Sequence, residues 1–167
     1  MAEPFEYISH ARLNYKDGYR NAYLGDVAEP VVYGVQGKLR EYYGAKEGPV
    51  IASTLDHIVA AVAGLMYGTL AGALSGRKIS FDRQLFTATV DGRIVGVGKT
   101  IRIESITLHY DLTAPPESRA AAERALAVHP EGCPAHQSVK GAIAVTWDAT
   151  LHLGNEVVHL SSETVPG

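Results

Sequence analysis

The stretch Ser53–Gly76, STLDHIVAAVAGLMYGTLAGALSG, carries the strongest structural signal in this 167-residue sequence. Ser53 is followed three residues later by Asp56, which is the spacing of a side-chain capping pair at the start of a helix. The nineteen residues from Ile58 to Gly76 carry no formal charge. We therefore predict one long apolar helix that begins beside Ser53.

Two environments are open for such a helix. Its length is almost enough to span a bilayer, and Gly64, Gly68 and Gly72 repeat at the four-residue spacing of membrane helix dimers. However, alanine and glycine dominate the segment and keep its hydrophobicity low, and the flanking segments have strand patterns. We favour a buried helix of a soluble protein, whose small residues allow a second helix to approach closely.

Composition limits the class of protein. Apolar residues make up 46% and charged residues 20% of the chain, which is typical of one folded domain over residues 1–167. The net charge of −3 argues against a nucleic-acid surface or a polybasic membrane anchor. The N-terminal MAEPFEY has no signal-peptide pattern, so we expect a cytoplasmic protein. A single cysteine, Cys133, excludes an intramolecular disulfide framework.

The segments around the long helix have mainly strand character. The Asp17-Gly18 pair predicts a hairpin that joins residues 6–15 to residues 18–24, followed by a strand over 30–36. Residues 37–52 are glycine-rich and are expected to form a loop. Alternating patterns predict strands over 79–91 and 98–113, and Val90-Asp91-Gly92 offers a turn between them.

The last third of the chain adds helices and a strand. Pro115-Pro116 predicts the start of a second helix, and Cys133-Pro134 the start of a short third helix. Residues 142–157 keep a strict period of two, with a short extension over 158–161. The order of strands, long helix, strands, helices and strand predicts an α+β fold.

Few residues offer chemistry. Cys133 has the position of a helix N-cap, where a thiolate is stabilised and its pKa is lowered, but an inert capping residue has the same pattern. Asp56 could hold a cation, and Arg40 or Arg20 could donate hydrogen bonds to a substrate oxygen. Cys133 and His136 have metal-ligand spacing, yet two ligands are too few, so neither a metal nor a cofactor is expected.

Two segments together resemble the OsmC/Ohr family, which comprises bacterial osmotically inducible and organic-hydroperoxide-resistance proteins. Residues 54–70, TLDHIVAAVAGLMYGTL, are similar to the central helix of the family. Residues 131–139, EGCPAHQSV, are similar to its second cysteine motif. The strands on either side fall where the strands of the family would lie, so the resemblance spans most of the chain.

The resemblance implies an intertwined homodimer in which antiparallel sheets surround the long central helices. It also implies an active site at the subunit interface, where a peroxidatic cysteine attacks a hydroperoxide and a second cysteine forms a disulfide with it. A dithiol then restores both cysteines, assisted by an arginine and a carboxylate. Cys133 matches the second cysteine, Asp56 falls near the carboxylate, and Arg40 is a better match for the arginine than Arg20.

The sequence departs from that pattern at the peroxidatic position, which is occupied by Leu65. A leucine cannot attack an O–O bond, so the two-cysteine mechanism is expected to be degenerate. One hypothesis is a one-cysteine peroxidase in which Cys133 is oxidised by a small organic hydroperoxide and reduced by an external thiol. The alternative is a non-catalytic dimeric module that binds a small apolar ligand at the subunit interface. Partners among nucleic acids or membranes are not expected.

Overall fold

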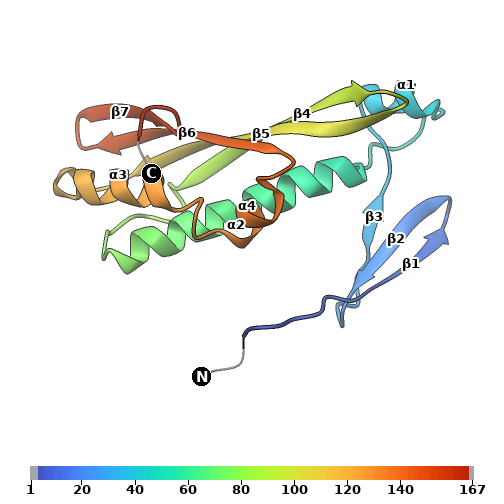
Figure 1. Cartoon of the computed structure of the whole chain (residues 1–167), viewed down its shortest axis with the longest axis horizontal. Coiled ribbons are helices and arrows are strands. Elements are labelled where there is room, and N and C mark those ends of the chain that lie inside the picture. Colours follow the sequence, from blue (N-terminus) through green and yellow to red (C-terminus); the bar gives the residue numbers. More distant parts are fainter. Residues whose placement is uncertain (1–3, 166–167) are drawn as a thin grey trace. The chain divides into compact units, whose positions relative to one another are not determined.

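The computed structural model describes residues 4–165, which form two compact units (Figure 1). The first unit ends at His57 and the second begins at Ile58, so the boundary falls within the first turns of helix α2 (Thr54–Gly76). Runs of strands and runs of helices follow one another along the chain, and the fold class is α+β, as predicted.

The first unit contains an antiparallel sheet of strands β1 (Ala11–Lys16), β2 (Tyr19–Leu24) and β3 (Val31–Tyr33). The predicted hairpin is confirmed: Asp17 and Gly18 have φ angles of 54° and 83°, the left-handed values that a tight two-residue turn needs. Strands β1 and β3 are shorter than predicted. Residues 6–10 and 34–36 lie outside them.

The expected loop over 37–52 is wrong in one part, because it contains the short helix α1 (Lys38–Tyr43). Gly44 ends this helix with a φ of 60°, a conformation that glycine adopts without steric cost. The glycines that suggested a loop are therefore boundary residues of a helix. Six residues are too few for an apolar periodicity to reveal it.

Helix α2 begins where the capping pair predicts. The backbone N–H of Asp56 donates to Ser53 Oγ at 3.1 Å, and the N–H of Ser53 donates to Asp56 Oδ2 at 2.7 Å. These reciprocal bonds satisfy backbone groups that would otherwise lack partners at the helix start. The helix is long and apolar enough to cross a membrane, but six of its side chains are buried in the chain, the last at Leu74.

The second unit contains a sheet of four strands in the order β4 (Thr87–Val97), β5 (Thr100–Thr113), β6 (Ala144–Leu153) and β7 (Glu156–Ser161). Two of its pairs are antiparallel as expected, but β5 and β6 are parallel. The chain between them crosses over through η1 (Pro116–Ser118), α3 (Arg119–Val128) and α4 (Pro134–Val139). Parallel neighbours require such a crossover.

The predicted turn at Val90-Asp91-Gly92 is also wrong, because these residues lie inside β4 and the hairpin turns after Val97. Gly92 has a different role. A Cβ atom at this position would lie 2.4 Å from Cγ2 of Val59, so glycine is what allows α2 to pack directly on β4.

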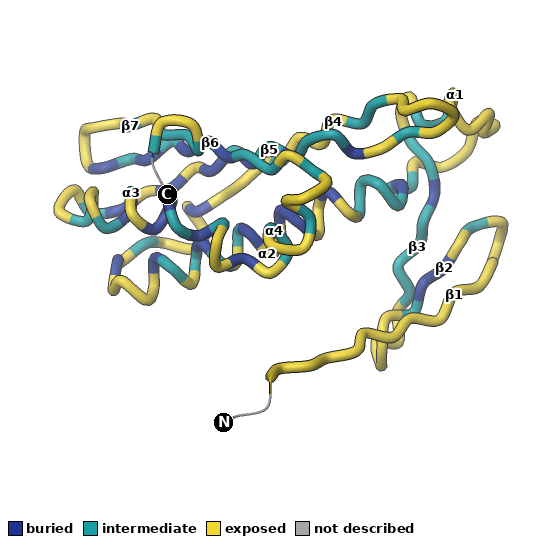
Figure 2. Tube along the Cα trace, viewed as in Figure 1, coloured by how far each residue is buried: buried dark blue, intermediate teal, exposed yellow. Residues whose placement is uncertain are grey.

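The core of the second unit lies between the sheet and the helices on one of its faces (Figures 1 and 2). The predicted alternation of β6 is confirmed from Trp147 onward, where every second side chain is buried, and β5 alternates in the same way from Ile106 onward. The buried residues of these strands are Ile106, Leu108, Tyr110, Leu112, Trp147, Ala149, Leu151 and Leu153. Such alternation is typical of a sheet with one covered face.

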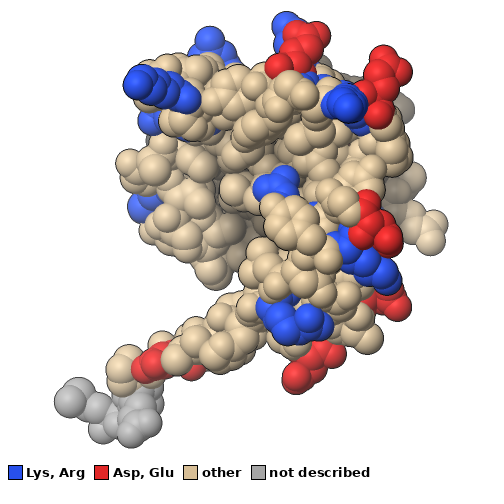
Figure 3. Space-filling model, turned by 90° about the vertical axis from the view of Figure 1, so that its right-hand side faces the viewer, with Lys and Arg blue, Asp and Glu red and all other residues tan. Residues whose placement is uncertain are grey.

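Charged side chains of both signs are interspersed on the face of the molecule drawn in Figure 3. The acidic excess of the whole chain is small, with a net charge of −3. A mixed surface of this kind favours solubility over binding to a polyanion.

Candidate functional site

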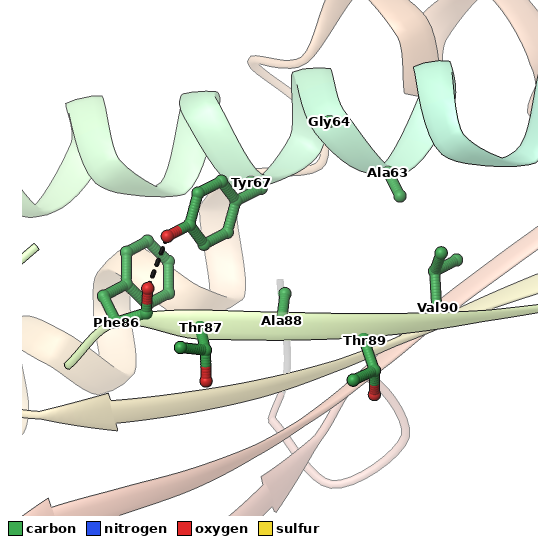
Figure 4. A pocket seen from close by; sticks show the side chains of 8 residues that line it. All are labelled: Ala63, Gly64, Tyr67, Phe86, Thr87, Ala88, Thr89 and Val90. Atoms are coloured by element: carbon green, nitrogen blue, oxygen red, sulfur yellow. Dashed lines mark hydrogen bonds between the residues drawn. The ribbon is translucent and has the colours of Figure 1, made fainter. Parts of the chain in front are cut away.

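An apolar groove of about 370 Å³ lies between α2 and β4, the edge strand of the four-stranded sheet. In Figure 4, Ala88 and Val90 point toward α2, whereas Thr87 and Thr89 point away from it. The groove is therefore bounded mainly by methyl groups, aromatic rings and strand backbone. The lining residues are Ala63, Gly64, Tyr67, Phe86, Thr87, Ala88, Thr89 and Val90.

Two aromatic rings form a rigid part of the groove wall. The rings of Tyr67 and Phe86 are stacked, with centroids 4.4 Å apart, and the Tyr67 hydroxyl donates a hydrogen bond to the Phe86 carbonyl (Figure 4). The phenol is thus oriented by both the ring contact and the hydrogen bond. A volume of this size and apolar character is typical of a site for a small organic molecule.

Leu65, at the predicted peroxidatic position, lies on an exposed side of α2 with 44% of its surface accessible. Its exposed neighbours on the helix are mostly small. They are Ile58, Ala61, Gly64, Gly68 and Gly72. The hydroxyl beside Leu65, that of Thr69, donates to the Leu65 carbonyl at 2.8 Å, and the exposed residues named above carry no thiol and no charge.

Cys133 is the N-cap residue of α4, as predicted, but its side chain is completely buried. Its backbone N–H donates to the Pro130 carbonyl at 3.1 Å, and its own carbonyl accepts from the Gln137 N–H at 3.0 Å. The backbone, and not the sulfur, completes this helix start. A sealed thiol cannot meet a dissolved hydroperoxide without an opening of the fold.

A buried histidine lies beside this cysteine turn. His129 is 1% exposed, accepts a hydrogen bond at Nε2 from the Tyr110 hydroxyl at 3.0 Å, and donates from Nδ1 to the Leu126 carbonyl at 2.7 Å. Burial lowers the pKa of His129 to about 4, so the ring is neutral at physiological pH. Burial, and then the nearness of Cys133, raise the pKa of Tyr110. Sequence reasoning missed this pair, because the two residues are nineteen positions apart.

Asp56 stabilises the N-terminal end of α2 through side-chain hydrogen bonds. Its carboxylate accepts from the Ser53 N–H at 2.7 Å and from Gln36 Nε2 at 2.9 Å. Partial burial opposes ionisation, but these hydrogen bonds outweigh it and lower the pKa of Asp56 below its ordinary value. The geometry makes Asp56 a capping and anchoring residue.

We expect Asp56→Ala to reduce the free energy of unfolding by about 1 kcal/mol at neutral pH, since the capping acceptor is lost. Because the folded-state pKa is lowered, this contribution is present above the unfolded-state pKa and disappears as the pH falls through the folded-state value. Urea unfolding of both proteins across the acidic range measures it. Asp26→Ala, which removes an exposed carboxylate without a hydrogen bond among residues 4–165, should have little effect. A loss that does not shrink on acidification would contradict this role.

Arg40 is held by backbone oxygens. Its guanidinium donates to the carbonyls of Lys46, Gly48 and Pro49 at 2.8, 3.0 and 2.6 Å. Arg20 lies opposite Tyr15 on one side and Tyr33 on the other in the first sheet. Both arginines line one hollow of about 270 Å³ in the first unit.

The predicted site residues are divided between the two units. Arg40 and Asp56 form no ion pair with each other in the described part of the chain, and Cys133 belongs to the core of the second unit. Within residues 4–165, no group of three or more His, Cys, Asp or Glu side chains is arranged to hold a metal ion. The groove could not be predicted from the sequence, because no motif around Phe86 or Ala88 distinguishes these residues from ordinary core residues.

Comparison with solved structures finds the same fold in several proteins. An OsmC-like protein from Mycoplasma pneumoniae matches with a TM-score of 0.65 and 17% identity, over 89% of this chain and 98% of that one. An organic hydroperoxide resistance protein OsmC from Legionella pneumophila matches with a TM-score of 0.64 and 14% identity, over 90% and 100%. An OsmC-like protein of unknown function from Vibrio cholerae matches with a TM-score of 0.66 and 10% identity, over 85% and 99%.

No family model and no curated protein sequence matches this chain. The structural matches cover nearly the full length of both partners, so the α+β architecture around a long helix is the OsmC fold. Sequence identities of 10–17% establish the shared architecture only. The chemistry of the site depends on this chain's own residues.

Proposed function

We propose that this protein, which has the OsmC fold, belongs to the OsmC/Ohr family and binds a small apolar molecule without reducing it. The observation that carries the proposal is the apolar groove between α2 and β4, beside a helix face on which Leu65 is exposed at the position that the family resemblance assigns to the peroxidatic cysteine. A family-level role in the response to organic hydroperoxides then rests on recognition of the organic part of such molecules.

The surroundings of the sulfur atoms favour binding over catalysis. Reduction of a hydroperoxide requires a thiolate that reaches the O–O bond, after which the sulfur becomes a sulfenic acid and an alcohol leaves. Cys133 has no accessible surface, and Met66 is a buried thioether. Neither sulfur atom is placed to meet a substrate in the groove.

A homodimer fits the exposed apolar surface of each unit. The first unit buries little of its own sheet, and all six residues of β1 are exposed. On α2, the small exposed residues around Leu65 would allow a second helix to approach closely. Apolar surface of this kind is characteristic of interfaces. We therefore propose that residues 1–167 act as one OsmC-like domain in an intertwined cytoplasmic homodimer.

Binding can be tested with cumyl alcohol, the reduced counterpart of cumene hydroperoxide. We expect it to raise the melting temperature of the protein in proportion to the logarithm of its concentration above saturation. Isothermal titration should give a matching affinity. No stabilisation by this probe or by an aliphatic alcohol series of increasing length would contradict the proposal.

Two substitutions on β4 locate the site. Ala88→Phe places a ring in the groove, because Ala88 points toward α2, and we expect affinity to fall by about tenfold or more. Val97→Phe adds the same ring at an exposed position of β4 outside the groove, so it should leave affinity nearly unchanged. Equal losses in the two variants would place the ligand elsewhere.

The thiol hypothesis has its own test. Consumption of cumene hydroperoxide with a dithiol reductant should be the same in the protein and in Cys133→Ser, because the sulfur is buried. Mass spectrometry should show an unmodified thiol after exposure to the peroxide. Turnover that depends on Cys133 would overturn the non-catalytic proposal in favour of a one-cysteine peroxidase.

A further inference from the structure

His109 in β5 is held between two carboxylates from neighbouring strands. Its Nδ1 lies 2.6 Å from Asp148 Oδ2 in β6, and its Nε2 lies 3.0 Å from Asp91 Oδ2 in β4. Asp148 is directly opposite His109 in the strand register, and Asp91 is diagonal to it because its own partner is Thr107. One imidazole therefore links three strands through side chains.

The two hydrogen bonds require a charged ring. A carboxylate can only accept, so each ring nitrogen must carry a hydrogen, and only the imidazolium form has both. Partial burial of His109 lowers its pKa, but the hydrogen bonds to Asp148 and Asp91 outweigh this effect and raise it above the ordinary value. When the ring loses a proton, at least one of the two bonds must break.

The bridge faces away from the core. The neighbours of His109 along the strand, Leu108 and Tyr110, are buried on the helix-covered face, so His109 projects from the other face. On the same face, Arg93 of β4 pairs with Glu104 of β5, and Asp111 of β5 pairs with His152 of β6. His159 of β7 lies within hydrogen-bond distance of Thr150.

Asp91 connects the side-chain bridge around His109 to edge strand β4. In the four-stranded sheet β4 is an edge strand, so within that sheet its backbone pairs only with β5. Asp91 directly follows Val90, the last residue of β4 that lines the groove. The bridge adds a side-chain link from this part of β4 through β5 to β6.

We propose that Asp91, His109 and Asp148 form a proton-operated clasp, which fastens edge strand β4 to the sheet at mildly acidic pH and loosens it when His109 becomes neutral. The clasp is a property of the second unit and does not depend on any ligand. Its effect on the groove, a change in affinity with pH, rests on the proposed function.

Side-chain nitrogen NMR across the neutral range tests the clasp. We expect His109 to remain an imidazolium to a higher pH than an unperturbed histidine. Asp148→Asn should lower its pKa, and Asp91→Asn should lower it less, because Asp91 is 86% exposed and its bond is longer. Asp111→Asn is the matched control, since it removes a carboxylate that pairs with His152. An ordinary or lowered pKa, or an equal effect of the control, would overturn the clasp.

Hydrogen exchange gives a second readout. Corrected for intrinsic rates, exchange at the backbone amides of β4 that bond to β5 near Asp91 should rise about two- to fivefold between about pH 6 and about pH 8, the range expected for loss of a partly exposed ion pair. His109→Gln should abolish this pH dependence. An unchanged pH dependence in His109→Gln would refute the clasp, whereas failure of cumyl alcohol to bind at any pH would refute only the proposed function.

Discussion

Gly92→Ala is expected to lower the free energy of unfolding by about 1–3 kcal/mol, the range for overpacking a well-filled core. The added Cβ would lie 2.4 Å from Cγ2 and 3.1 Å from Cγ1 of Val59. A valine in a helix has essentially one side-chain rotamer, so it cannot turn away from the new atom. Either α2 or β4 must then shift. Urea unfolding monitored by circular dichroism measures the loss.

The same strand and the same contact supply the controls for this prediction. Gly96→Ala is also in β4, where a Cβ would meet nothing within 4 Å, so its stability should change little. Val59→Ala combined with Gly92→Ala should recover part of the loss, because the clashing methyl groups are removed. Additive effects of the two substitutions, or a loss at Gly96 as large as at Gly92, would show that the contact does not determine stability.

Leu65→Cys is expected to consume hydroperoxide about tenfold or more faster than the unmodified chain, because it supplies an accessible thiol. The position is 44% exposed on α2 and matches the place where the family resemblance puts the peroxidatic cysteine. The new thiolate would attack the O–O bond, release an alcohol and become a sulfenic acid, which a dithiol reduces to thiol and water. Peroxide loss with dithiothreitol measures the rate.

Two further variants interpret that result. Ala61→Cys places an exposed thiol one turn earlier on the same helix, and it should consume peroxide more slowly than Leu65→Cys. Adding Cys133→Ser to Leu65→Cys distinguishes a single thiol from a pair, since only a pair can form an internal disulfide. Equal rates at positions 61 and 65 would contradict the assignment of position 65 to a reaction site.

Elements that depend on neighbours in the chain could be predicted from the sequence. The Ser53–Asp56 capping pair, the turn at Asp17-Gly18 and the start of α4 after Cys133 all involve groups within four residues of one another. Their geometry is set by local hydrogen bonds and allowed backbone angles. The alternation of β6 was equally readable, because one face of its sheet is covered throughout.

The candidate site was less predictable, because its features depend on packing. Cys133 has the sequence of a reactive helix cap, yet its burial is decided by the surrounding core. From the sequence, the guanidinium of Arg40 was expected to be available to a substrate. In the structure it donates hydrogen bonds to three backbone carbonyls between residues 46 and 49. The groove needs α2 and β4 side by side, which no local pattern encodes.

What the sequence determined by itself is thus the order of most elements, the start of α2, the Asp17-Gly18 turn and the absence of a thiol at position 65, since each depends on residue identity and short-range bonding. Only the tertiary structure shows that Gly92 is a packing position and not a turn. The reason is that the side chain of Val59 occupies the space in which a Cβ atom at position 92 would lie. It also decided which side chains surround His109, since Asp91 and Asp148 are 18 and 39 residues away in sequence. Contacts between residues so far apart in sequence form only when the strands pair, so they can be known only from the tertiary structure.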